Sequence, residues 1–408
     1  MNRIVAFAHA FAAALLVVLV SVPACAARRV PIAEPADPHP PGISFVPLPG
    51  HPFSAITTSD GKWLFVSVTT SNPTSVNGVA MLRLDGAKAT LEKVFLVEGE
   101  PTGMVMTHDD KTLIVADGDY VVFMDVGRMT SKRDDPILGY ISDGDYPGSV
   151  YVNVTTDDRF LFVSDEGVQT ITVINLQKAR ADGFNASAIV GKIPVGIAPI
   201  ALTFSPDGRW LYTTSQVAPK SYGWPVDCKP EGGDPATATP QKPQGAVIVV
   251  DVARAQTDPA NAVIARAPSG CNPVRLAISP GGERVYVTAR NSNALLAFDA
   301  AKLRTDSEHA LIGKVAVGTS PVGVAVVNDG KQVLVTNSNR FSSDRTARQT
   351  LTVIDAAKVA EGQSAVITNI PAGAFPREFG RSPNGRVIFV ANYSSSEIQI
   401  IDLDRVTF

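Results

Sequence analysis

Charged residues are scarce in this sequence, and neither sign prevails. Lys and Arg number 36 and Asp and Glu 39, so charged residues make up 18% of the chain and the formal net charge is −3. A nucleic-acid-binding protein neutralises phosphates with clustered Lys and Arg, and the sequence has no such basic patch. A polybasic membrane anchor is equally absent. With 45% apolar residues, the composition is typical of a well-buried globular chain.

Residues that carry common enzyme chemistry are also few. The chain has 5 His and 3 Cys, and no further His or Cys stands beside the cysteines to complete a zinc site. His39, His108 and His309 fall in a linker, beside a turn and in a loop, so we expect no multi-histidine metal site. There is no Cys-x-x-Cys-His haem motif, no Gly-x-Ser-x-Gly nucleophile elbow and no phosphate-binding Gly-rich loop before a helix. We therefore predict no cofactor.

A hard cation such as Ca²⁺ or Mg²⁺ is the one metal that the sequence leaves open. Oxygen ligands of the kind it prefers occur at Asp117, Asp119, Asp165 and Glu166. Acidic residues in such loops more often form solvated turns.

The N-terminus has the order of a secretory signal peptide. Arg3 precedes an almost uncharged apolar run over residues 4–22, and Ala24-Cys25-Ala26 is a small-x-small cleavage site. We predict a signal peptide at residues 1–26, and hence a periplasmic or secreted protein. A membrane-spanning helix is the alternative on length alone, and Pro23 and the cleavage site argue against it. Lipid attachment at Cys25 is a minor alternative.

Removal of that segment leaves two cysteines. Cys228 and Cys271 then form an even pair, which in an oxidising compartment is most simply a disulfide. The sharper alternative is a catalytic or metal-binding pair of thiols. Residues 27–41 are rich in proline and predict an extended tether, with no membrane span after processing.

One motif recurs along the rest of the chain: an apolar strand, a two-residue turn and a second apolar strand. Residues 199–215 are its cleanest copy, with the turn at Asp207-Gly208. The turns align at Asp60-Gly61, Asp109-Asp110, Asp157-Asp158, Asp207-Gly208, Gly281-Gly282, Asp329-Gly330 and Asn384-Gly385. In six of these seven units a proline stands eight residues before the turn, and the third unit departs. Each unit continues to a third strand, and several show a fourth.

Seven units of four short antiparallel strands predict an all-β fold, a seven-bladed β-propeller. The chain ends on a third strand at residues 398–402, while residues 42–49 precede the first complete unit. We predict that this spare N-terminal strand joins the last blade, because pairing the two ends removes an open edge. The propeller then forms one domain over residues 42–408, with an insertion at residues 216–245.

The repeat resembles the YVTN-type family of seven-bladed propellers, which has lactonase-like and surface-layer-like members. The residues that carry the resemblance are the Ser-Pro-Asp-Gly turn, Tyr286-Val287-Thr288 and Val335-Thr336-Asn337. It covers roughly residues 42 to 403. Many activities sit on one such scaffold, so the resemblance implies the fold and says little of function.

Alternating strand direction sorts the loops by face. If the two-residue turns lie at the bottom, the loops between second and third strands lie on top. The three longest of these loops, at residues 69–78, 216–245 and 339–349, then decorate one face, as do both Cys228 and Cys271. A face with long loops is expected to bind something, and neutral loop growth is the alternative.

Charged residues interrupt the innermost strands, where most residues are small or apolar. In one interpretation Glu378 pairs with an arginine and pins the blades together, because charges in crowded strands must be paired or hydrated. In the other, the channel mouth binds an anionic or carbonyl-bearing ligand, which bidentate arginine suits. The candidate ligand-binding residues are Arg275, Arg377, Glu378, Arg381, Tyr151 and His51.

These features favour an exported binding scaffold that acts through its top face, with a small anionic or carbonyl ligand or another exported protein as partner. The alternative is a lactonase-type hydrolase with an Arg- and Glu-lined channel. Phe375-Pro-Arg-Glu-Phe379 resembles the Pro-Arg-x-Phe opening of a late blade in seven-bladed lactonases, which implies lactone hydrolysis by channel Arg, His and Glu. Arg377 and Glu378 are then the catalytic candidates.

The match to lactonases is incomplete. Pro273-Val-Arg275 stands where that family has a Pro-Arg-His opening, so no histidine is available as general base. A quinone- or metal-dependent dehydrogenase propeller is a remote alternative that lacks its cofactor ligands here.

Overall fold

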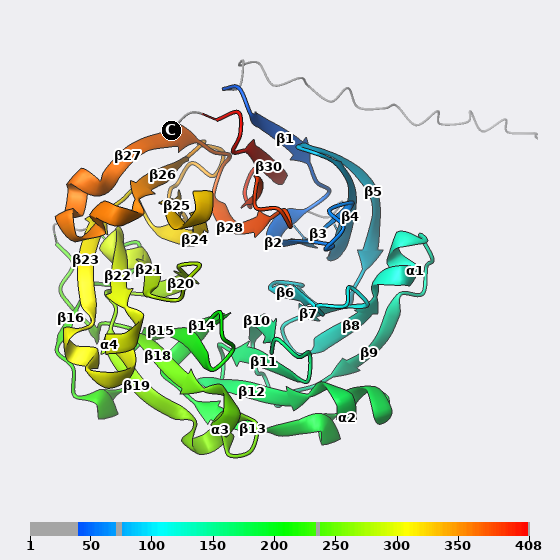
Figure 1. The fold of residues 1–408 in the computed structure, drawn as a ribbon, viewed down its shortest axis with the longest axis horizontal. Helices are drawn as coiled ribbons and strands as arrows, with labels where there is room; N and C mark the ends of the chain where they lie inside the picture. The colour runs from blue at the N-terminus through cyan, green and yellow to red at the C-terminus, as the bar shows by residue number, and fades with distance from the viewer. Residues whose placement is uncertain (1–39, 71–75, 234–236, 407–408) are drawn as a thin grey trace, which may run out of the picture. The chain divides into compact units, whose positions relative to one another are not determined.

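A computed structural model describes residues 40–70, 76–233 and 237–406. The predicted signal peptide, Cys25 and all but the last two residues of the tether lie outside the described residues. Seven four-stranded antiparallel sheets follow one another around a central axis (Figure 1). The chain is therefore the all-β, seven-bladed propeller that the repeats predict. Among the described residues, no helix has the length and apolar character needed to cross a membrane.

The first four blades follow the chain from the innermost strand outward. Their strands are β2 (His51–Thr57), β3 (Trp63–Thr69), β4 (Gly78–Asp85) and β5 (Lys88–Leu96); β6 (Met104–Met106), β7 (Thr112–Ala116), β8 (Val121–Asp125) and β9 (Ile137–Ile141); β10 (Ser149–Val154), β11 (Phe160–Asp165), β12 (Thr170–Asn175) and β13 (Ile189–Pro194); and β14 (Ile197–Phe204), β15 (Trp210–Val217), β18 (Ala246–Asp251) and β19 (Val263–Pro268). In blade four the insertion holds the hairpin of β16 (Val226–Cys228) and β17 (Lys242–Pro243).

Blades five and six repeat this order, and blade seven takes its outermost strand from the N-terminal part of the chain. Their strands are β20 (Pro273–Ile278), β21 (Arg284–Ala289), β22 (Ala294–Asp299) and β23 (Leu311–Ala316); β24 (Pro321–Val327), β25 (Gln332–Asn337), β26 (Thr350–Asp355) and β27 (Val366–Pro371); and β28 (Pro376–Arg381), β29 (Val387–Asn392), β30 (Glu397–Asp402) and β1 (Ile43–Pro47). The predicted closure is confirmed, because β1 pairs with β30 from Ile43↔Ile401 to Pro47↔Glu397.

Short helices lie between the third and fourth strands of several blades. They are α1 (Val126–Thr130), α2 (Leu176–Ala181), α3 (Val252–Ala255), α4 (Ala300–Thr305) and the 3₁₀ segment η7 (Ala356–Ala365). The acidic or polar residue that ends each third strand caps the helix that follows. The Asp125 carboxylate, for example, accepts the backbone N–H of Arg128 at 2.8 Å.

Other 3₁₀ segments occur in the loops. They are η1 (Ala186–Ala188), η2 (Lys220–Tyr222), η3 (Pro259–Asn261), η4 (Arg290–Ser292), η5 (Ser307–His309) and η6 (Asn328–Gly330).

The core lies between the blades. Seven of the eight apolar clusters combine residues of two neighbouring sheets, such as Tyr212 and Val249 of blade four with Val287 and Leu296 of blade five. Blades one and seven share a cluster that contains Val66 and Phe389, so apolar packing as well as the β1–β30 ladder closes the ring.

Where the second residue of a bottom turn is aspartate instead of glycine, its side chain forms a hydrogen bond to the neighbouring blade. The second turn residue has a positive φ, +67° at Gly61 and +55° at Asp110. Asp110 bears the strain of that conformation, and its carboxylate accepts the backbone N–H of Ser59 in the preceding blade at 2.8 Å. His108 makes the same contact with Asp158 of the next blade, also at 2.8 Å.

Candidate functional site

A cavity of about 480 Å³ opens at the top of the central channel. Its first layer comes from one repeat position, the second residue of the aligned unit, which follows the blade-opening proline in each contributing blade except blade three, where Val150 follows Ser149. Phe53, Thr102, Val150, Ile200, Val274 and Arg377 occupy that position. Five of the six are uncharged, so the repeat itself builds a largely neutral ring in which Arg377 is the exception.

A second layer of lining residues lies at the top ends of second strands. Each of these residues directly follows the last residue of the second strand that pairs with the third strand of the same blade. The residues at this position that line the cavity are Thr69, Glu166, Gln216, Arg290 and Tyr393. The connection between β5 and β6 adds Glu100, and the long top loops of blades four and six add Glu231 and Arg340. The cavity is thus made where the repeat ends and the sequences of the blades diverge.

Arg275 and Glu378 form a buried ion pair that joins blade five to blade seven. Only 4% of Arg275 and 6% of Glu378 is exposed. The Tyr151 ring lies 4.7 Å from the Arg275 guanidinium, and burial raises the pKa of Tyr151. Removing either ion would leave its partner charged in an apolar surrounding, so the pair holds the two blades together.

Gly323 lets the intervening blade fit beside this pair. A Cβ at Gly323 would lie 2.4 Å from the carbonyl oxygen of Arg377, so a larger residue would push blades six and seven apart.

Arg377 is held by aromatic rings rather than by an acid. Its guanidinium carbon lies 4.0 Å from the centre of the Phe53 ring and 5.2 Å from that of Tyr393. Within the described part of the chain its buried Nε has no hydrogen-bond partner and its side chain forms no ion pair. Burial, together with the like charges of Arg275 and Arg340, lowers the pKa of Arg377 to about 9. The site therefore destabilises the positive charge of Arg377, and a bound anion would stabilise that charge and raise the pKa of Arg377.

Arg340 is the second guanidinium of this kind. It lies half-buried in the cavity wall, 5.8 Å from the centre of the Phe375 ring. Burial, and then the charge of Arg290, lowers the pKa of Arg340. Its side chain forms no ion pair or hydrogen bond with the residues that the structure describes.

Arg290, in contrast, is fully engaged by the blade-four insertion. Its Nε and Nη2 atoms lie 2.5 and 2.7 Å from the carboxylate of Glu231. Nη2 also donates to Gln216 at 2.7 Å, and the Gln216 amide donates to Glu166 at 2.9 Å. One hydrogen-bonded chain thus runs around the rim from blade five through blade four to blade three.

The remaining sequence-predicted residues lie outside the cavity lining. His51 stacks on Tyr393 at 4.4 Å between ring centres and donates from Nδ1 to the Tyr393 carbonyl oxygen at 2.6 Å. It therefore supports a lining residue. Arg381 lies at the other end of β28, exposed beside its own turn. Four residues of extended strand separate it from Arg377 by about 13 Å, which removes it from the channel mouth.

Two of the acidic residues considered as cation ligands are buried rather than solvated. Asp117 is 2% exposed and accepts the backbone N–H of Gly99 at 3.1 Å, and burial raises the pKa of Asp117 to about 6. Asp165 is fully buried, and burial beside Asp143 raises the pKa of Asp165 to about 8. Thr172 and Lys192 contact Asp165 at 2.6 and 3.2 Å, so protein groups occupy the oxygen that faces them.

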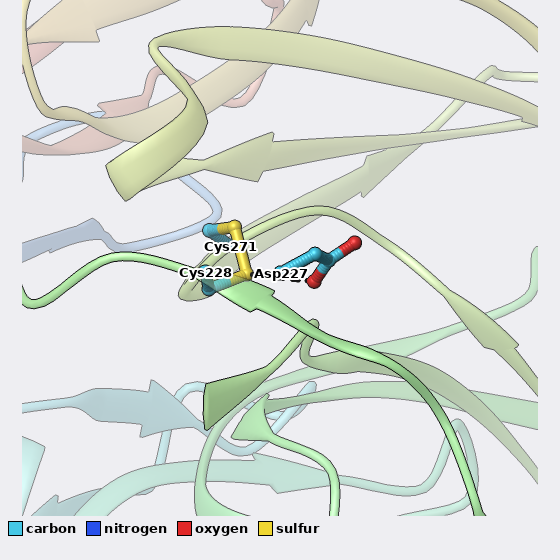
Figure 2. A group of neighbouring side chains, drawn as sticks. All are labelled: Asp227, Cys228 and Cys271. Atoms are coloured by element: carbon cyan, nitrogen blue, oxygen red, sulfur yellow. Dashed lines mark hydrogen bonds between the residues drawn. A yellow bond between two sulfur atoms is a disulfide. The ribbon is translucent and has the colours of Figure 1, made fainter. Parts of the chain in front are cut away.

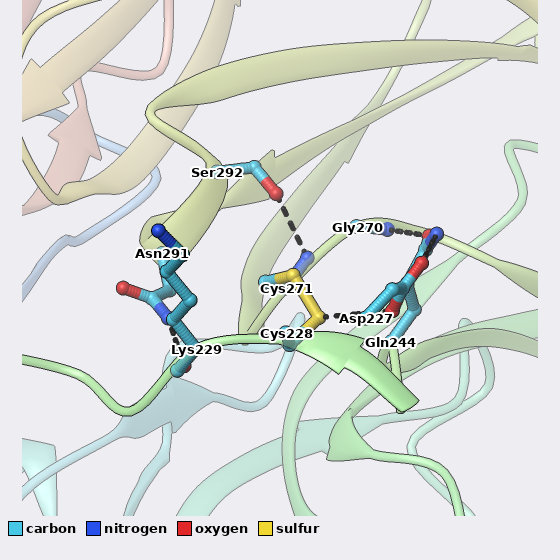
Figure 3. Close-up of a disulfide and its surroundings, with 8 residues drawn as sticks. All are labelled: Asp227, Cys228, Lys229, Gln244, Gly270, Cys271, Asn291 and Ser292. Carbon is cyan, nitrogen blue, oxygen red and sulfur yellow. Dashed lines mark hydrogen bonds between the residues drawn. A yellow bond between two sulfur atoms is a disulfide. The ribbon is translucent and has the colours of Figure 1, made fainter. Parts of the chain in front are cut away.

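A disulfide joins Cys228 of the insertion to Cys271, which precedes β20 (Figure 2). Asp227 lies beside it, and these three residues are the one group in the described chain with the spacing of metal ligands. Because the two sulfurs are bonded to each other, neither is a thiolate ligand in this state. Hydrogen bonds surround the bridge: the Cys271 backbone N–H donates to the Ser292 hydroxyl oxygen, and the Gln244 amide donates to the Asp227 carboxylate (Figure 3). The insertion is therefore anchored to blade five.

A larger cavity, of about 840 Å³, lies at the bottom turns of blades five and six. Its polar groups already serve the fold. Glu283 accepts from Ser279 at 2.9 Å, Arg284 donates to the Ala356 carbonyl oxygen, and Asp355 caps η7. The channel mouth, which keeps unpaired guanidinium groups, is the better candidate site.

The cavity residues Glu100, Glu231, Arg290 and Arg340 were not predicted from the sequence, and Glu166 was named only as a possible ligand for a hard cation. Comparing the seven units at the end of the second strand, in addition to the innermost strand, would have found Glu166 and Arg290. Glu231 and Arg340 stand in long loops that have no counterpart in the other units, so no alignment of repeats reveals them.

The fold and the cavity define a seven-bladed β-propeller with a polar site at the top of its channel. Residues 244–407 match a family model described as lactonase, 7-bladed beta-propeller. The matched segment is less than half of the chain. Together with the seven-bladed arrangement, it supports a likeness to lactonase-like seven-bladed propellers, which the repeat motif also indicates. No curated protein matches the chain.

Solved structures share the fold at low sequence identity. Hydrazine synthase of Kuenenia stuttgartiensis is 18% identical, with a TM-score of 0.61 over 88% of this chain and 97% of that one. The Cps50 (Swd1) β-propeller domain of Myceliophteria thermophila is 11% identical, with 0.61 over 90% and 100%. A chain of a mitotic checkpoint complex is 13% identical, with 0.64 over 96% and 98%. At these identities the likeness concerns the fold alone.

Proposed function

We propose that this protein is an exported β-propeller that binds a small carboxylate-bearing ligand in the top-face cavity. Arg340 and Arg377 carry the proposal, because both guanidinium groups reach one cavity and neither has an ionic partner among the described residues. A carboxylate can accept two parallel hydrogen bonds from a guanidinium, which compensates for the burial of the cation. Export rests on the N-terminal sequence and agrees with the disulfide.

The test is calorimetric titration of the purified protein with acetate, butyrate and caproate. We expect binding of at least the longer acids, because the apolar ring of Val150, Ile200 and Val274 lines the same cavity. Arg377→Met should raise the dissociation constant by about tenfold or more, the value of a charge-assisted hydrogen bond. The matched control is Arg386→Met, because Arg386 pairs with Asp404 in an exposed position away from the cavity. Equal affinity in both variants would refute the proposal.

Lactone hydrolysis is the second candidate, and the family match over residues 244–407 favours it. In such a reaction water attacks the ring carbonyl carbon, the ring C–O bond breaks, and a hydroxy acid forms, which ionises to the carboxylate and releases a proton to the solvent. Arg377 would stabilise the developing oxyanion. No histidine is among the cavity-lining residues, so Glu100 or Glu166 would take the proton from water and return it to the leaving alkoxide.

A pH-stat assay over a panel of γ- and δ-lactones distinguishes the two candidates. Turnover that Arg377→Met abolishes and Arg386→Met leaves unchanged would establish hydrolysis. Ligand binding without turnover on any lactone would leave the binding function alone.

A further inference from the structure

The walls of the top-face cavity carry opposite charges. Arg290, Arg340 and Arg377 come from blades five, six and seven, whereas Glu100 and Glu166 come from the segments of blades two and three. Because the blades follow the chain around the axis, β6 and β10 lie across the channel from β20 and β24 (Figure 1). One side of the cavity is therefore cationic and the other anionic.

No ion pair crosses this cavity within the described part of the chain. Arg290 is neutralised by Glu231 of the insertion, and Arg275 by Glu378. Arg340 and Arg377 remain on one wall. On the other, Glu166 accepts only the amide of Gln216, and Glu100 has no hydrogen bond or ion pair with any described residue. The charges that would cancel one another are held apart by an open space of about 480 Å³.

This separation selects among ligands. A simple carboxylate would satisfy the arginines and leave the glutamates without a partner. A metal cation bound at the glutamates would find two carboxylates where Ca²⁺ takes six to eight oxygen ligands, and it would leave the arginines unpaired. A molecule with an anionic and a cationic end satisfies both walls, and complementary charges of this kind set specificity.

We propose that the ligand is a zwitterion, an amine-bearing carboxylate such as an amino acid or short peptide. Its carboxylate lies against Arg340 and Arg377, and its ammonium group lies against Glu100 and Glu166. The ring of Val150, Ile200 and Val274 lines the space between them and accepts an aliphatic or aromatic body. This inference rests on the proposed carboxylate-binding function and adds the second charge.

Three matched pairs of probes test the ammonium group and cover several charge separations: glycine with acetate, γ-aminobutyrate with butyrate, and ε-aminocaproate with caproate. Each is titrated calorimetrically into the full mature protein. We expect at least one amine-bearing acid to bind about ten- to a hundredfold more tightly than its parent acid, the range of a hydrogen bond to a charged group. Glu100→Gln/Glu166→Gln should abolish that advantage by weakening the amine-bearing acid, whereas the parent acid should bind no less tightly because two like charges leave its cavity.

Glu98→Gln is the matched control, because Glu98 is an acid of the same loop that is not among the cavity-lining residues. It should keep the full advantage. If amine-bearing and parent acids bind equally and both lose affinity in Arg377→Met, the carboxylate function stands and the zwitterion inference is overturned. If neither class binds, both proposals fail. A selectivity for the amine that survives Glu100→Gln/Glu166→Gln would also overturn the assignment to these glutamates.

Discussion

At the scale of single residues, Asp117 shows how a buried acid makes stability depend on pH. Burial, opposed by the Gly99 N–H and reinforced by the charges of Glu100 and Glu98, raises the pKa of Asp117 to about 6. An unfolded Asp titrates near about 3.9, so the folded state binds the proton more tightly between these two values. Stability from this group is complete at low pH and falls as the pH rises toward 6.

Asp117→Asn removes that ionisation and keeps an acceptor for the Gly99 N–H. We expect the variant to be more stable than the native chain at pH 8 by about 1–3 kcal/mol, and equal to it near pH 4. Urea unfolding at the two pH values measures the difference. Asp119→Asn is the control, because Asp119 is exposed in the same loop and should change stability little. A gain of the same size at both pH values would contradict this account.

At the scale of one element, the blade-four insertion acts as a strap across the rim of the cavity. The β16–β17 hairpin is held by the disulfide to Cys271, by the Asn291 amide on the Lys229 carbonyl oxygen at 2.7 Å and by the Glu231–Arg290 pair. Glu231 thereby neutralises one cavity arginine, which leaves Arg340 and Arg377 for a ligand.

Cys228→Ser/Cys271→Ser should loosen this strap. We expect a loss of about 2–4 kcal/mol in the free energy of unfolding, because the bridge restricts the unfolded chain. Hydrogen exchange should accelerate in residues 226–243, while β15 and β18 keep their protection because their ladder does not depend on the insertion. Unchanged exchange across the hairpin would show that the polar contacts suffice without the bridge.

At the scale of the whole molecule, the ring is closed by its two ends. β1 supplies the outer strand of blade seven, and the Asp402 N–H donates to the Gly42 carbonyl oxygen at 2.8 Å. Without β1, β30 would become an exposed edge strand with unpaired N–H and C=O groups, which invites association between chains.

A chain that begins at residue 48 therefore tests closure against one that begins at residue 40 and keeps β1. We expect the shorter chain to lose at least about 3 kcal/mol of stability, from the burial of Ile43 and the ladder of β1, and to aggregate. Thermal unfolding and light scattering of the two chains give the comparison. Equal stability and a monodisperse shorter chain would mean that apolar packing between blades one and seven closes the ring unaided.

The fold could be predicted because it depends on local and repeated signals. The turn pairs and the apolar strands recur in all seven units and the opening proline at its position in six, so a departure in one unit is recognised by comparison with the others. The ion pair of Arg275 and Glu378 was also indicated by the sequence, because both are charged residues at a strand position that is otherwise small or apolar.

The sequence alone thus determined the architecture, the closure by the N-terminal strand and the presence of Arg377 at the channel mouth. Only the tertiary structure decided that Glu378 forms an ion pair with Arg275, that Arg381 lies at the far end of its strand and that Glu231 forms an ion pair with Arg290. The physical reason is that a ring brings residues of different blades together at its axis. Which charges cancel and which stay free there depends on distances across the channel, and no spacing along the chain encodes them.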